Sequence, residues 1–423
     1  MAFYICTYCN LFVYDEDTGE KRADLMPGTK VKNISADWKC PVCGESVSFL
    51  SEINEEKFLE KKTEYDKLFP LKTPDKQDKD ILGYMSISRQ QLAGICSVNK
   101  VCDGNPNRLC MGQNYGGSIG FGGAGQGRTF DANFKALEKY TFKMKVIKKN
   151  HEPEMQTSFL GKKIIMPLMV SSMSGVKLSM NNVMPEEDFQ RAMIEGAKFF
   201  GTIGMSGNTV DVPDHPGIEI IQENEGWGIP VFKPQSQDRL LALFKKAEDA
   251  NVIAIGIDLD GYGSTNWALR GKPLYRKSEK ELKELVDATT KPIIFKGVMS
   301  VEDAAKVVDS GAAAVDVSNH GGRVLDFGQG VAEVLPNITD EFKGKITIMA
   351  DGAVRSGFDI LKLLALGADV ALVGRPIGRM ALAGGSQAVK IHLDYYKHDL
   401  RMAMLMTGCD TLTEISREIL CTH

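Results

Sequence analysis

The sequence lacks any uncharged apolar run that approaches the roughly 18 residues of a membrane span. It also begins without the basic segment and apolar stretch of a secretory signal. The sequence also lacks a large excess of either charge, because its 51 Lys and Arg residues nearly balance its 55 Asp and Glu residues, which gives a formal net charge of −4. Such a balance gives no reason to expect nucleic acid or an anionic membrane as a partner. We therefore expect a cytoplasmic protein with neither partner.

The length and composition indicate a folded protein of more than one domain. The chain has 423 residues, of which 43% are hydrophobic and 25% charged, the proportions of an ordinary globular protein. We expect four segments, which differ in cysteine, glycine and charge content. They are a cysteine-bearing domain (1–52), a charged linker (53–80), a cysteine- and glycine-rich segment (81–157) and a long α/β domain (158–423).

Two C-x-x-C pairs near the start predict a metal site. The chain has nine cysteines, an odd number that argues against complete disulfide pairing. Four of them, Cys6, Cys9, Cys40 and Cys43, form the two pairs. Each pair can present two thiolates to one ion, which gives the tetrahedral geometry preferred by zinc or iron. A segment of this size has a small core, so metal binding is expected to contribute to its folding.

Three further cysteines precede a glycine-rich stretch at 116–127. Cys96, Cys102 and Cys110 match no familiar metal-binding spacing, and a cluster would need a fourth ligand from Cys409 or Cys421. Free thiols are the alternative. The glycines follow no obvious strand, so we expect a loop over the active site rather than a dinucleotide fingerprint.

From about residue 164, short apolar runs alternate with helical patterns. Continuous β-branched runs indicate strands that are buried on both faces, and the repetition indicates parallel pairing. Eight such units predict a (β/α)₈ TIM barrel, with a doubly wound open sheet as the alternative. The expected strands are Ile164–Val170, Phe199–Ile203, Pro230–Phe232, Val252–Ile257, Pro292–Phe295, Ala313–Val317, Ile346–Met349 and Val370–Val373.

Polar residues that follow these strands are candidates for the active site, because catalytic groups in such barrels lie at the carboxyl ends of the strands. Arg355 and Arg375 follow the seventh and eighth strands beside glycines, a pattern that predicts a phosphate site. His320 lies between the sixth strand and a double glycine. Imidazole titrates near neutral pH, so His320 is the candidate general base.

Residues 1–50 resemble rubredoxin, a family that holds one iron ion in four cysteines. A zinc ribbon remains the alternative. The first C-x-x-C turn ends in Asn10 rather than the usual glycine, which leaves the redox potential open but not the ligands. The resemblance rests on Tyr4, Phe12, Tyr14–Asp15, Pro27–Thr29, Asp37–Trp38 and Cys40–Gly44, in addition to the cysteine spacing.

Residues 157–420 resemble the FMN-dependent α-hydroxy acid dehydrogenases, which include glycolate oxidase, lactate oxidase and flavocytochrome b2. Residues 96–147 resemble the front of clostridial α-hydroxy-acid oxidizing proteins. The matching stretches are Thr157–Pro167, Ser318–Arg323, Asp351–Gly357, Leu364–Ala368, Gly374–Pro376 and Thr407–Cys409.

This resemblance implies a role for each matched residue. His320 would remove a proton from the substrate, with Asp260 as its carboxylate partner and Asp258 as the fallback. Arg323 would bind the substrate carboxylate, and Lys296 would stabilise the negatively charged reduced flavin. The implied flavin contacts are Ser171, Ser172, Ser206, Lys233, Asp258, Lys296, Ser318, Asp351, Gly352, Arg355, Gly374 and Arg375. A homotetramer is the implied assembly.

One departure concerns the third strand, where the family carries a catalytic tyrosine. Here the segment reads Phe232-Lys233-Pro234-Gln235, so the tyrosine is absent and Lys233 is expected to contact flavin instead. The family resemblances together predict oxidation of a small, lactate-like 2-hydroxy acid and one-electron exchange between FMN and the fused iron domain. The direction of electron flow and an external one-electron partner stay open. The alternatives are an FMN barrel of the type 2 isopentenyl diphosphate isomerase kind, and a zinc-ribbon interaction protein with an inactive barrel.

Overall fold

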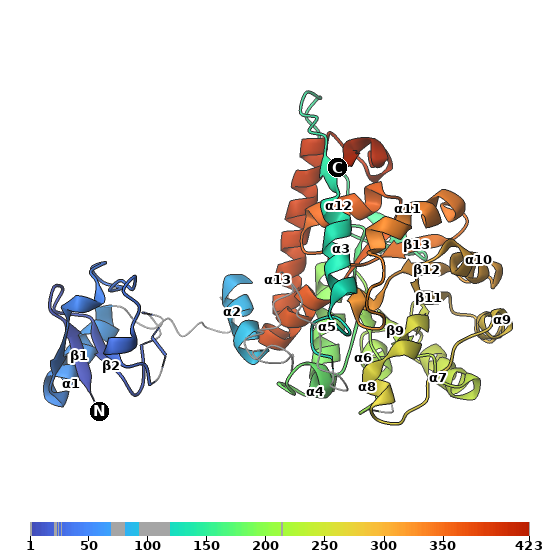
Figure 1. Cartoon of the computed structure of the whole chain (residues 1–423). Coiled ribbons are helices and arrows are strands. Elements are labelled where there is room, and N and C mark those ends of the chain that lie inside the picture. The colour runs from blue at the N-terminus through green and yellow to red at the C-terminus, as the bar shows by residue number, and fades with distance from the viewer. Residues whose placement is uncertain are drawn as a thin grey trace. The chain divides into compact units, whose positions relative to one another are not determined.

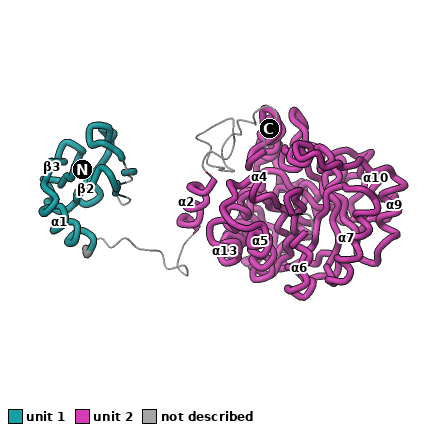
Figure 2. Tube along the Cα trace, turned by 90° about the horizontal axis from the view of Figure 1, so that it is seen from below, with its two compact units in different colours: residues 1–79 teal, residues 80–423 magenta. Residues whose placement is uncertain are grey.

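The computed structural model describes residues 2–20, 23, 25–26, 28–68, 81–92, 119–212 and 215–422. The chain divides into two compact units, residues 1–79 (unit 1) and 80–423 (unit 2), which are coloured separately in Figure 2. Cys96, Cys102 and Cys110 lie outside the described residues, so the question of a cluster there is not addressed by the structure.

Unit 1 is built on a small antiparallel sheet. Strand β1 (Phe3–Cys6) pairs with β2 (Val13–Asp15) on one side and β3 (Leu50–Ile53) on the other. Two short 3₁₀ helices, η2 (Val31–Asn33) and η3 (Val47–Phe49), belong to the intervening chain. Cys6 is the last residue of β1, so the first C-x-x-C turn begins where this strand ends.

Helix α1 (Glu55–Leu68) is part of this unit's core. Phe58 stacks on Phe3 with 4.5 Å between ring centroids, and Tyr65 meets Phe12 edge-on at 5.6 Å. The structure here differs from the linker expected at 53–80. The many charged residues of this segment indicated a linker, but two of its aromatic side chains pack into the core of unit 1. Residues 69–80 lie outside the described part of the chain.

Unit 2 contains a closed barrel of eight parallel strands, which confirms the predicted TIM barrel. Around the barrel the strand order is β10-β11-β12-β13-β14-β7-β8-β9, so each strand pairs with its neighbours in sequence. The strands are β7 (Leu168–Met173), β8 (Gly204–Ser206), β9 (Ile229–Phe232), β10 (Ile255–Asp258), β11 (Ile293–Val298), β12 (Ala314–Val317), β13 (Thr347–Ala350) and β14 (Val370–Val373).

Helices surround the barrel, and short strand pairs lie outside it (Figure 1). Strand β4 (Tyr140–Phe142) pairs with β15 (Leu420–Thr422), and β5 (Thr157–Phe159) pairs with β6 (Lys162–Ile164). The helices are α2 (Ile81–Gln91), α3 (Arg128–Glu138), α4 (Val176–Ser179), α5 (Glu186–Phe200), α6 (Gly217–Glu223), α7 (Gln237–Asp249), α8 (Thr265–Ala268), α9 (Glu279–Asp287), α10 (Val301–Asp309), α11 (Val331–Phe342), α12 (Gly357–Ala365) and α13 (Arg375–Thr407).

The second strand lies later in the chain than the sequence predicted. The expected run Phe199–Ile203 begins in the last turn of α5, which ends at Phe200 and is capped by Gly201 in a left-handed conformation with φ 95°. The observed strand is β8, Gly-Met-Ser, whose glycine and serine escape a search for apolar runs. The eighth expected strand, Val370–Val373, coincides with β14.

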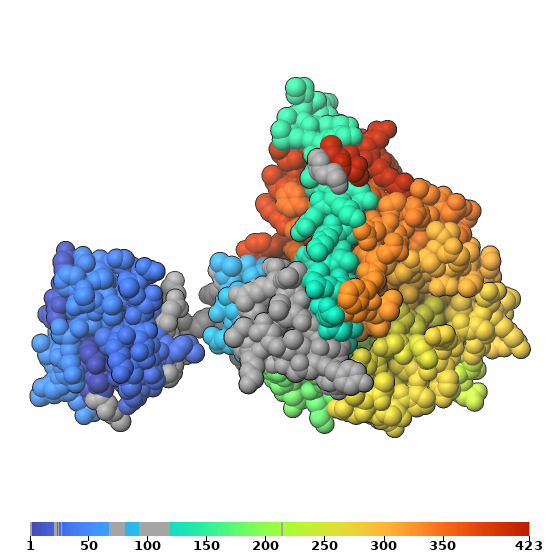
Figure 3. Space-filling model, viewed as in Figure 1, coloured from blue at the N-terminus to red at the C-terminus, as the bar shows by residue number. Residues whose placement is uncertain are grey.

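Two helices outside the eightfold repeat cover parts of unit 2. Helix α2 packs on α13, where Arg379 donates hydrogen bonds to Ser88 Oγ and to the carbonyl of Met85. Helix α3 lies against α11 and the 3₁₀ turn η5 (His320–Gly322), as the teal-green band beside the orange segment in Figure 3 shows. Within the described part of the chain, no helix is both long and apolar enough to cross a membrane.

Candidate functional site

The four cysteines of the C-x-x-C pairs meet in unit 1. Sγ of Cys6 lies 3.7 Å from Sγ of Cys43, Sγ of Cys9 lies 3.9 Å from Sγ of Cys40, and all four sulfurs fall within 4.8 Å of one another. A tetrahedral ion with metal–sulfur bonds of about 2.3 Å separates its ligand sulfurs by about 3.8 Å. The donor set and its spacing therefore fit one tetrahedral metal ion.

The two cysteine turns have matching backbones. The N–H of Asn10 donates to the carbonyl of Cys6 at 2.8 Å, and the N–H of Gly44 donates to that of Cys40 at 2.8 Å. Asn10 and Gly44 both adopt positive φ, 51° and 78°. Asparagine tolerates this conformation better than most residues, which explains how Asn10 replaces the usual glycine without altering the turn.

A cavity opens at the carboxyl ends of the barrel strands in unit 2. Polar groups from the carboxyl ends of all eight strands line it, together with Ile119, Gly120 and Phe121 from within the glycine-rich stretch. The predicted residues that line it are Ser171, Ser172, Lys233, Asp258, Lys296, His320, Arg323, Asp351, Gly352, Arg355, Gly374 and Arg375. Residues distant in the sequence thus meet at one place, as the strand-end rule predicts.

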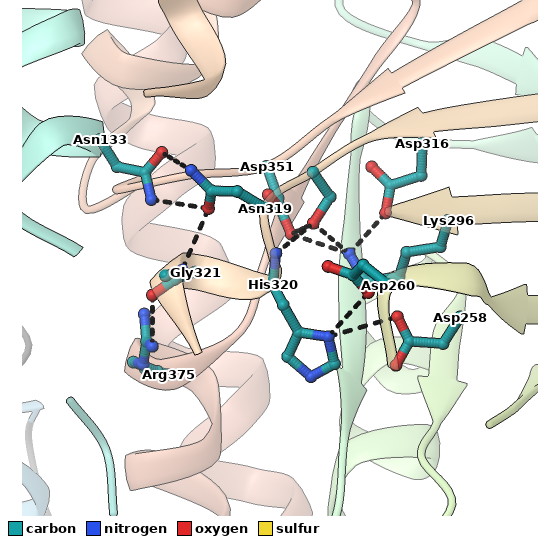
Figure 4. Close-up of polar contacts among 12 residues, drawn as sticks. Asn133, Asp258, Asp260, Lys296, Asp316, Asn319, His320, Gly321, Asp351 and Arg375 are labelled. Atoms are coloured by element: carbon teal, nitrogen blue, oxygen red, sulfur yellow. Dashed lines mark hydrogen bonds and ion pairs between the residues drawn. The ribbon is translucent and has the colours of Figure 1, made fainter. Parts of the chain in front are cut away.

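His320 is held by two carboxylates. Its Nδ1 lies 3.1 Å from Oδ1 of Asp260 and 3.3 Å from Oδ1 of Asp258, and both acids face the imidazole in Figure 4. His320 has a positive φ of 57°, a conformation rare outside glycine that recurs at functional sites. Asp260 approaches strand β11 at Gly297, where any Cβ would come within 2.5 Å of its Cγ.

The three groups titrate together. Burial raises the pKa of Asp260 to about 6, and the neighbouring Asp258 adds to this shift. Burial alone would lower the pKa of His320, but the charges of Asp258 and Asp260 outweigh it, so the pKa lies above its ordinary value. His320 and Lys233 hold the pKa of Asp258 well below its usual range despite its burial. The pair of acids therefore stabilises the imidazolium.

Lys233 lies beside the imidazole. Its Nζ forms an ion pair with Oδ2 of Asp258 and lies 3.5 Å from Nε2 of His320. The side chain is mostly buried and lines the cavity. At the end of β9, the lysine thus places a positive charge next to the ring nitrogen that does not contact the carboxylates.

Lys296, within β11, is held by three hydrogen bonds. Its Nζ donates to Ser318 Oγ at 2.6 Å, to Asp316 Oδ2 at 2.7 Å and to Asp351 Oδ2 at 2.9 Å (Figure 4). Although almost fully buried, Lys296 borders the cavity. The surrounding carboxylates raise the pKa of Lys296 well above its ordinary value, against the effect of burial.

Three arginines surround the cavity. Arg323 donates to the carbonyl of Gly120 and contacts Ser179 Oγ at 3.4 Å. Arg375 donates to the carbonyl of Gly321 at 2.7 Å and lies over the ring of Phe130. Arg355 lies over the ring of Phe134. Each guanidinium is thus oriented by a carbonyl, hydroxyl or aromatic contact before any ligand binds.

The charges fit a flavin mononucleotide. Arg355 and Arg375 follow neighbouring strands β13 and β14, and burial lowers the pKa of Arg355 to about 10. A phosphate dianion would favour the charged form of this buried guanidinium. Lys296 offers a further positive charge, and Val231 and Leu372 supply apolar surface for a ring system. The donor set therefore matches one phosphate and one flat, partly apolar group.

Three predicted residues do not line the cavity. Ser206 is fully buried on β8, and its hydroxyl has no hydrogen-bond partner among the described residues. Ser318 lies behind Lys296 and donates to Asp351 Oδ2 at 2.7 Å. Asp260 lies behind His320, whose Nδ1 it contacts. Direct flavin contact is therefore an expectation that the geometry supports less for Ser206 and Ser318 than for the lining residues.

Sequence reasoning missed several polar residues of the site, among them Asn133 and Asp316. Asn133, on α3, exchanges hydrogen bonds of 2.9 Å with Asn319 and so holds the loop that carries His320. Because α3 precedes the barrel, the strand-end rule gives no signal for it. Asp316 lies inside the barrel next to Lys296. A carboxylate within the apolar run Ala313–Val317 was a signal that the sequence did contain.

Comparison with known proteins identifies the class to which this site belongs. The chain matches the FMN-dependent dehydrogenase family over residues 119–272 and 270–422, and rubredoxin over residues 3–48. The first match spans more than half of the chain. The chain belongs to the FMN-dependent dehydrogenase family and carries an N-terminal rubredoxin domain. It is an enzyme of the α-hydroxy acid dehydrogenase and oxidase group, and the matches imply FMN and a metal as cofactors.

Individual relatives agree with this assignment. An L-lactate oxidase of Lacticaseibacillus rhamnosus is 27% identical over 325 residues, which cover 70% of this chain and 86% of the relative. An L-lactate dehydrogenase of Xanthomonas campestris is 32% identical over 248 residues, or 56% of this chain and 64% of the relative. A solved mandelate oxidase is 28% identical with a TM-score of 0.62, covering 71% of this chain and 93% of that one.

A flavocytochrome b2 variant shares the fold with this chain. Its TM-score is 0.65 at 24% identity, and the match covers 85% of this chain and 90% of that one. At this identity the likeness shows the architecture of the barrel alone.

Proposed function

We propose that the protein oxidises a small, lactate-like 2-hydroxy acid to the 2-oxo acid, and that FMN and an iron ion in the four-cysteine site exchange electrons singly. The observation that carries the proposal is the arrangement at His320. Its Nδ1 contacts Asp260 and Asp258, and the residue borders a cavity that Arg323 also lines. A base and a carboxylate-binding cation on one cavity suit a hydroxy acid.

In this reaction, His320 would act as the base, Asp260 as its partner and Arg323 as the group that binds the substrate. Oxidation of a 2-hydroxy acid removes two electrons and two protons, and bound FMN would accept both electrons and the proton that His320 does not take. His320 takes one of the protons, and Asp260 holds its Nδ1–H and stabilises the resulting imidazolium. Arg323 binds the substrate carboxylate through paired N–H donors.

Lys233 takes a place in this scheme because the family's catalytic tyrosine is absent. Its Nζ lies 3.5 Å from Nε2 of His320 and is bonded to Asp258. From this position the ammonium faces the region where a substrate would approach the base. We assign it a contact with flavin or with the substrate's oxygen, and Asp258 balances its charge.

Flavin contacts are proposed for residues around the remainder of the cavity. Arg355 and Arg375, with the backbone of Gly352 and Gly374, would hold the phosphate end, and Asp351 the ribityl chain. Ser171 and Ser172 line the side near β7. Lys296 would place its positive charge beside the reduced flavin, and Ser318 accepts a hydrogen bond from Lys296. Ser206, which is buried behind the residues that line the cavity, is the remaining proposed flavin contact.

Iron rather than zinc is proposed for the cysteine cluster (Cys6, Cys9, Cys40 and Cys43). The match to rubredoxin over residues 3–48 supports iron, and the sulfur spacing accommodates either ion. Zinc has one valence state and could not exchange an electron. Iron would therefore allow the fused domain to exchange electrons with the flavin.

The test begins with metal analysis and a visible spectrum of the purified full chain. Iron, FMN and bleaching of the flavin band on anaerobic addition of L-lactate, glycolate or mandelate are expected. Zinc alone, or no flavin, would contradict the cofactor assignment. Diphosphate isomerisation without any bleaching would instead favour the isomerase alternative.

A homotetramer is also proposed, as the family resemblance implies. The segment that follows β4 projects from unit 2 in Figure 1 and carries exposed apolar side chains among lysines. Met144 is 70% exposed, Val146 55% and Ile147 fully exposed. Such a grouping is typical of a contact surface. Light scattering of the full chain would report the assembly.

A further inference from the structure

Asp316 is a buried acid that the proposed chemistry leaves unused. It is the one charged residue of strand β12 and has no exposed surface. Its Oδ2 lies 2.7 Å from Nζ of Lys296, while its Oδ1 has no hydrogen-bond partner among the described residues. Burying a carboxylate is costly unless it serves a specific partner, and that partner here is Lys296.

The ammonium of Lys296 lies between Asp316 and the cavity. Lys296 and Asp351 both line the cavity, whereas Asp316 does not. Asp351 and Ser318 hold the ammonium from the β13 and β12 ends, and Asp316 holds it from within the barrel (Figure 4). A ligand at this wall would thus meet a positive charge that a hidden negative charge offsets.

We propose that Asp316 is a positioning residue that acts through Lys296 to lower the reduction potential of the flavin bound in the cavity. The inference rests on the proposed function, since it requires FMN beside Lys296. An ammonium stabilises the negatively charged reduced flavin by simple attraction. A carboxylate 2.7 Å behind the ammonium opposes that attraction, and burial keeps the opposing charge from being screened by water.

The same geometry makes the effect dependent on pH. The charged groups that face Asp316 are Lys296 and Asp351, with Asp260 farther off. Burial raises the pKa of Asp316 to about 7, and Lys296 limits the rise. Below this pH the carboxylate binds a proton from solvent and becomes neutral. The charge of Lys296 is then less opposed, so the flavin potential is expected to rise more steeply as the pH falls.

The experiment is a redox titration of the FMN-loaded full chain against a reference dye. Asp316→Asn keeps the shape of the side chain and removes its charge. We expect the ratio of reduced to oxidised flavin at a fixed dye potential to increase at least tenfold, which corresponds to ~30 mV for a two-electron couple. Asp287→Asn, at an exposed site on α9, removes the same charge and should leave the ratio unchanged.

A second comparison separates a charge effect from a structural one. In a Lys296→Met background, Asp316→Asn should no longer raise the potential, because the residue through which it acts is gone. The wild-type potential should also show a change of slope near neutral pH that Asp316→Asn lacks. This measurement on the wild type tests the idea even if the variants do not fold.

The outcomes distinguish the inference from the function on which it rests. FMN binding with substrate bleaching, but an unchanged potential in Asp316→Asn or a wild-type potential without the change of slope, would overturn the role of Asp316 alone. A wild-type protein that binds no FMN would overturn the proposed function itself.

Discussion

The two units build their centres in opposite ways. In unit 1, two short turns supply all four sulfurs, and each turn is a local C-x-x-C pattern with a left-handed residue behind it. In unit 2, His320 and its carboxylate partners come from the ends of β12 and β10. The ligands of the first centre can therefore be recognised from the local sequence. The second exists only because the barrel closes.

The difference extends to what stabilises each unit. The core of unit 1 consists of a few aromatic and aliphatic residues around Cys6 and Cys40. The core of unit 2 consists of a large cluster of strand and helix residues and a smaller cluster made mostly of barrel-strand residues. Unit 1 should therefore depend on its metal, while unit 2 should fold without its cofactor. Four variants test this contrast, ordered by the size of the expected effect.

Cys40→Ser should produce the largest effect. The thiol is buried and shares the site with three other sulfurs, so its loss leaves an incomplete tetrahedron. We expect the metal content and the thiolate absorption to be lost and unit 1 to become protease-sensitive, while the flavin spectrum of unit 2 is retained. Cys421→Ser, at a cysteine outside the cluster, is the control. Retention of bound metal would show that the fold of unit 1 does not need the complete site.

His320→Gln should lower the rate of flavin reduction by substrate about 10³-fold, the usual contribution of a general base. FMN affinity should change little, because the imidazole is bonded to Asp260 and Asp258 rather than to the arginines of the phosphate end. Rapid-mixing kinetics measure the rate. His398→Gln, an exposed histidine of α13, should behave as wild type. A comparable loss of the flavin reduction rate in both variants would contradict the proposed role of His320 as the base.

Tyr65→Ala tests whether α1 belongs to the core of unit 1. The ring is 1% exposed and meets Phe12 edge-on. Truncating a buried aromatic residue costs about 3 kcal/mol or more of unfolding free energy. Leu59→Ala, on the same helix at 57% exposure, should cost little. Urea unfolding followed by thiolate absorption gives both values, and equal values would mean that α1 is a tether.

Asp260→Asn should produce the smallest effect, a shift in the pH profile. A general base is active when neutral, so the rate rises with pH through the pKa of His320, which the structure places above its ordinary value. Removing the Asp260 charge lowers that pKa, and the rising limb should move to lower pH by about one unit. Asp309→Asn, exposed on α10, should leave the limb in place. A shift to higher pH would contradict the proposed pairing.

The sequence predicted the barrel because its strands are buried on both faces and follow one another with helices between. The rule that strand ends meet then brought His320, Lys296 and Arg375 together without any structure. The cysteine cluster was predictable from spacing alone. Both domain families are confirmed by the comparisons.

The elements that escaped prediction share a physical cause. Strand β8 contains glycine and serine, which have little preference for strands, so tertiary packing decides its structure. Helix α1 has a sequence that favours a helix, but its packing through Phe58 and Tyr65 depends on distant residues. Asn133 contacts Asn319 across 186 positions of sequence, which no local pattern encodes. Asp316 was visible as a carboxylate in an apolar run, but only the structure shows that it faces Lys296.

Anaerobic single-turnover mixing of the full chain with substrate tests the central claim most directly. The flavin and iron bands would be followed together at several protein concentrations. We predict that the iron changes valence on the timescale of turnover, at a rate that does not depend on dilution. Flavin that is reduced by substrate while the iron keeps its valence throughout turnover would contradict electron exchange between the two centres.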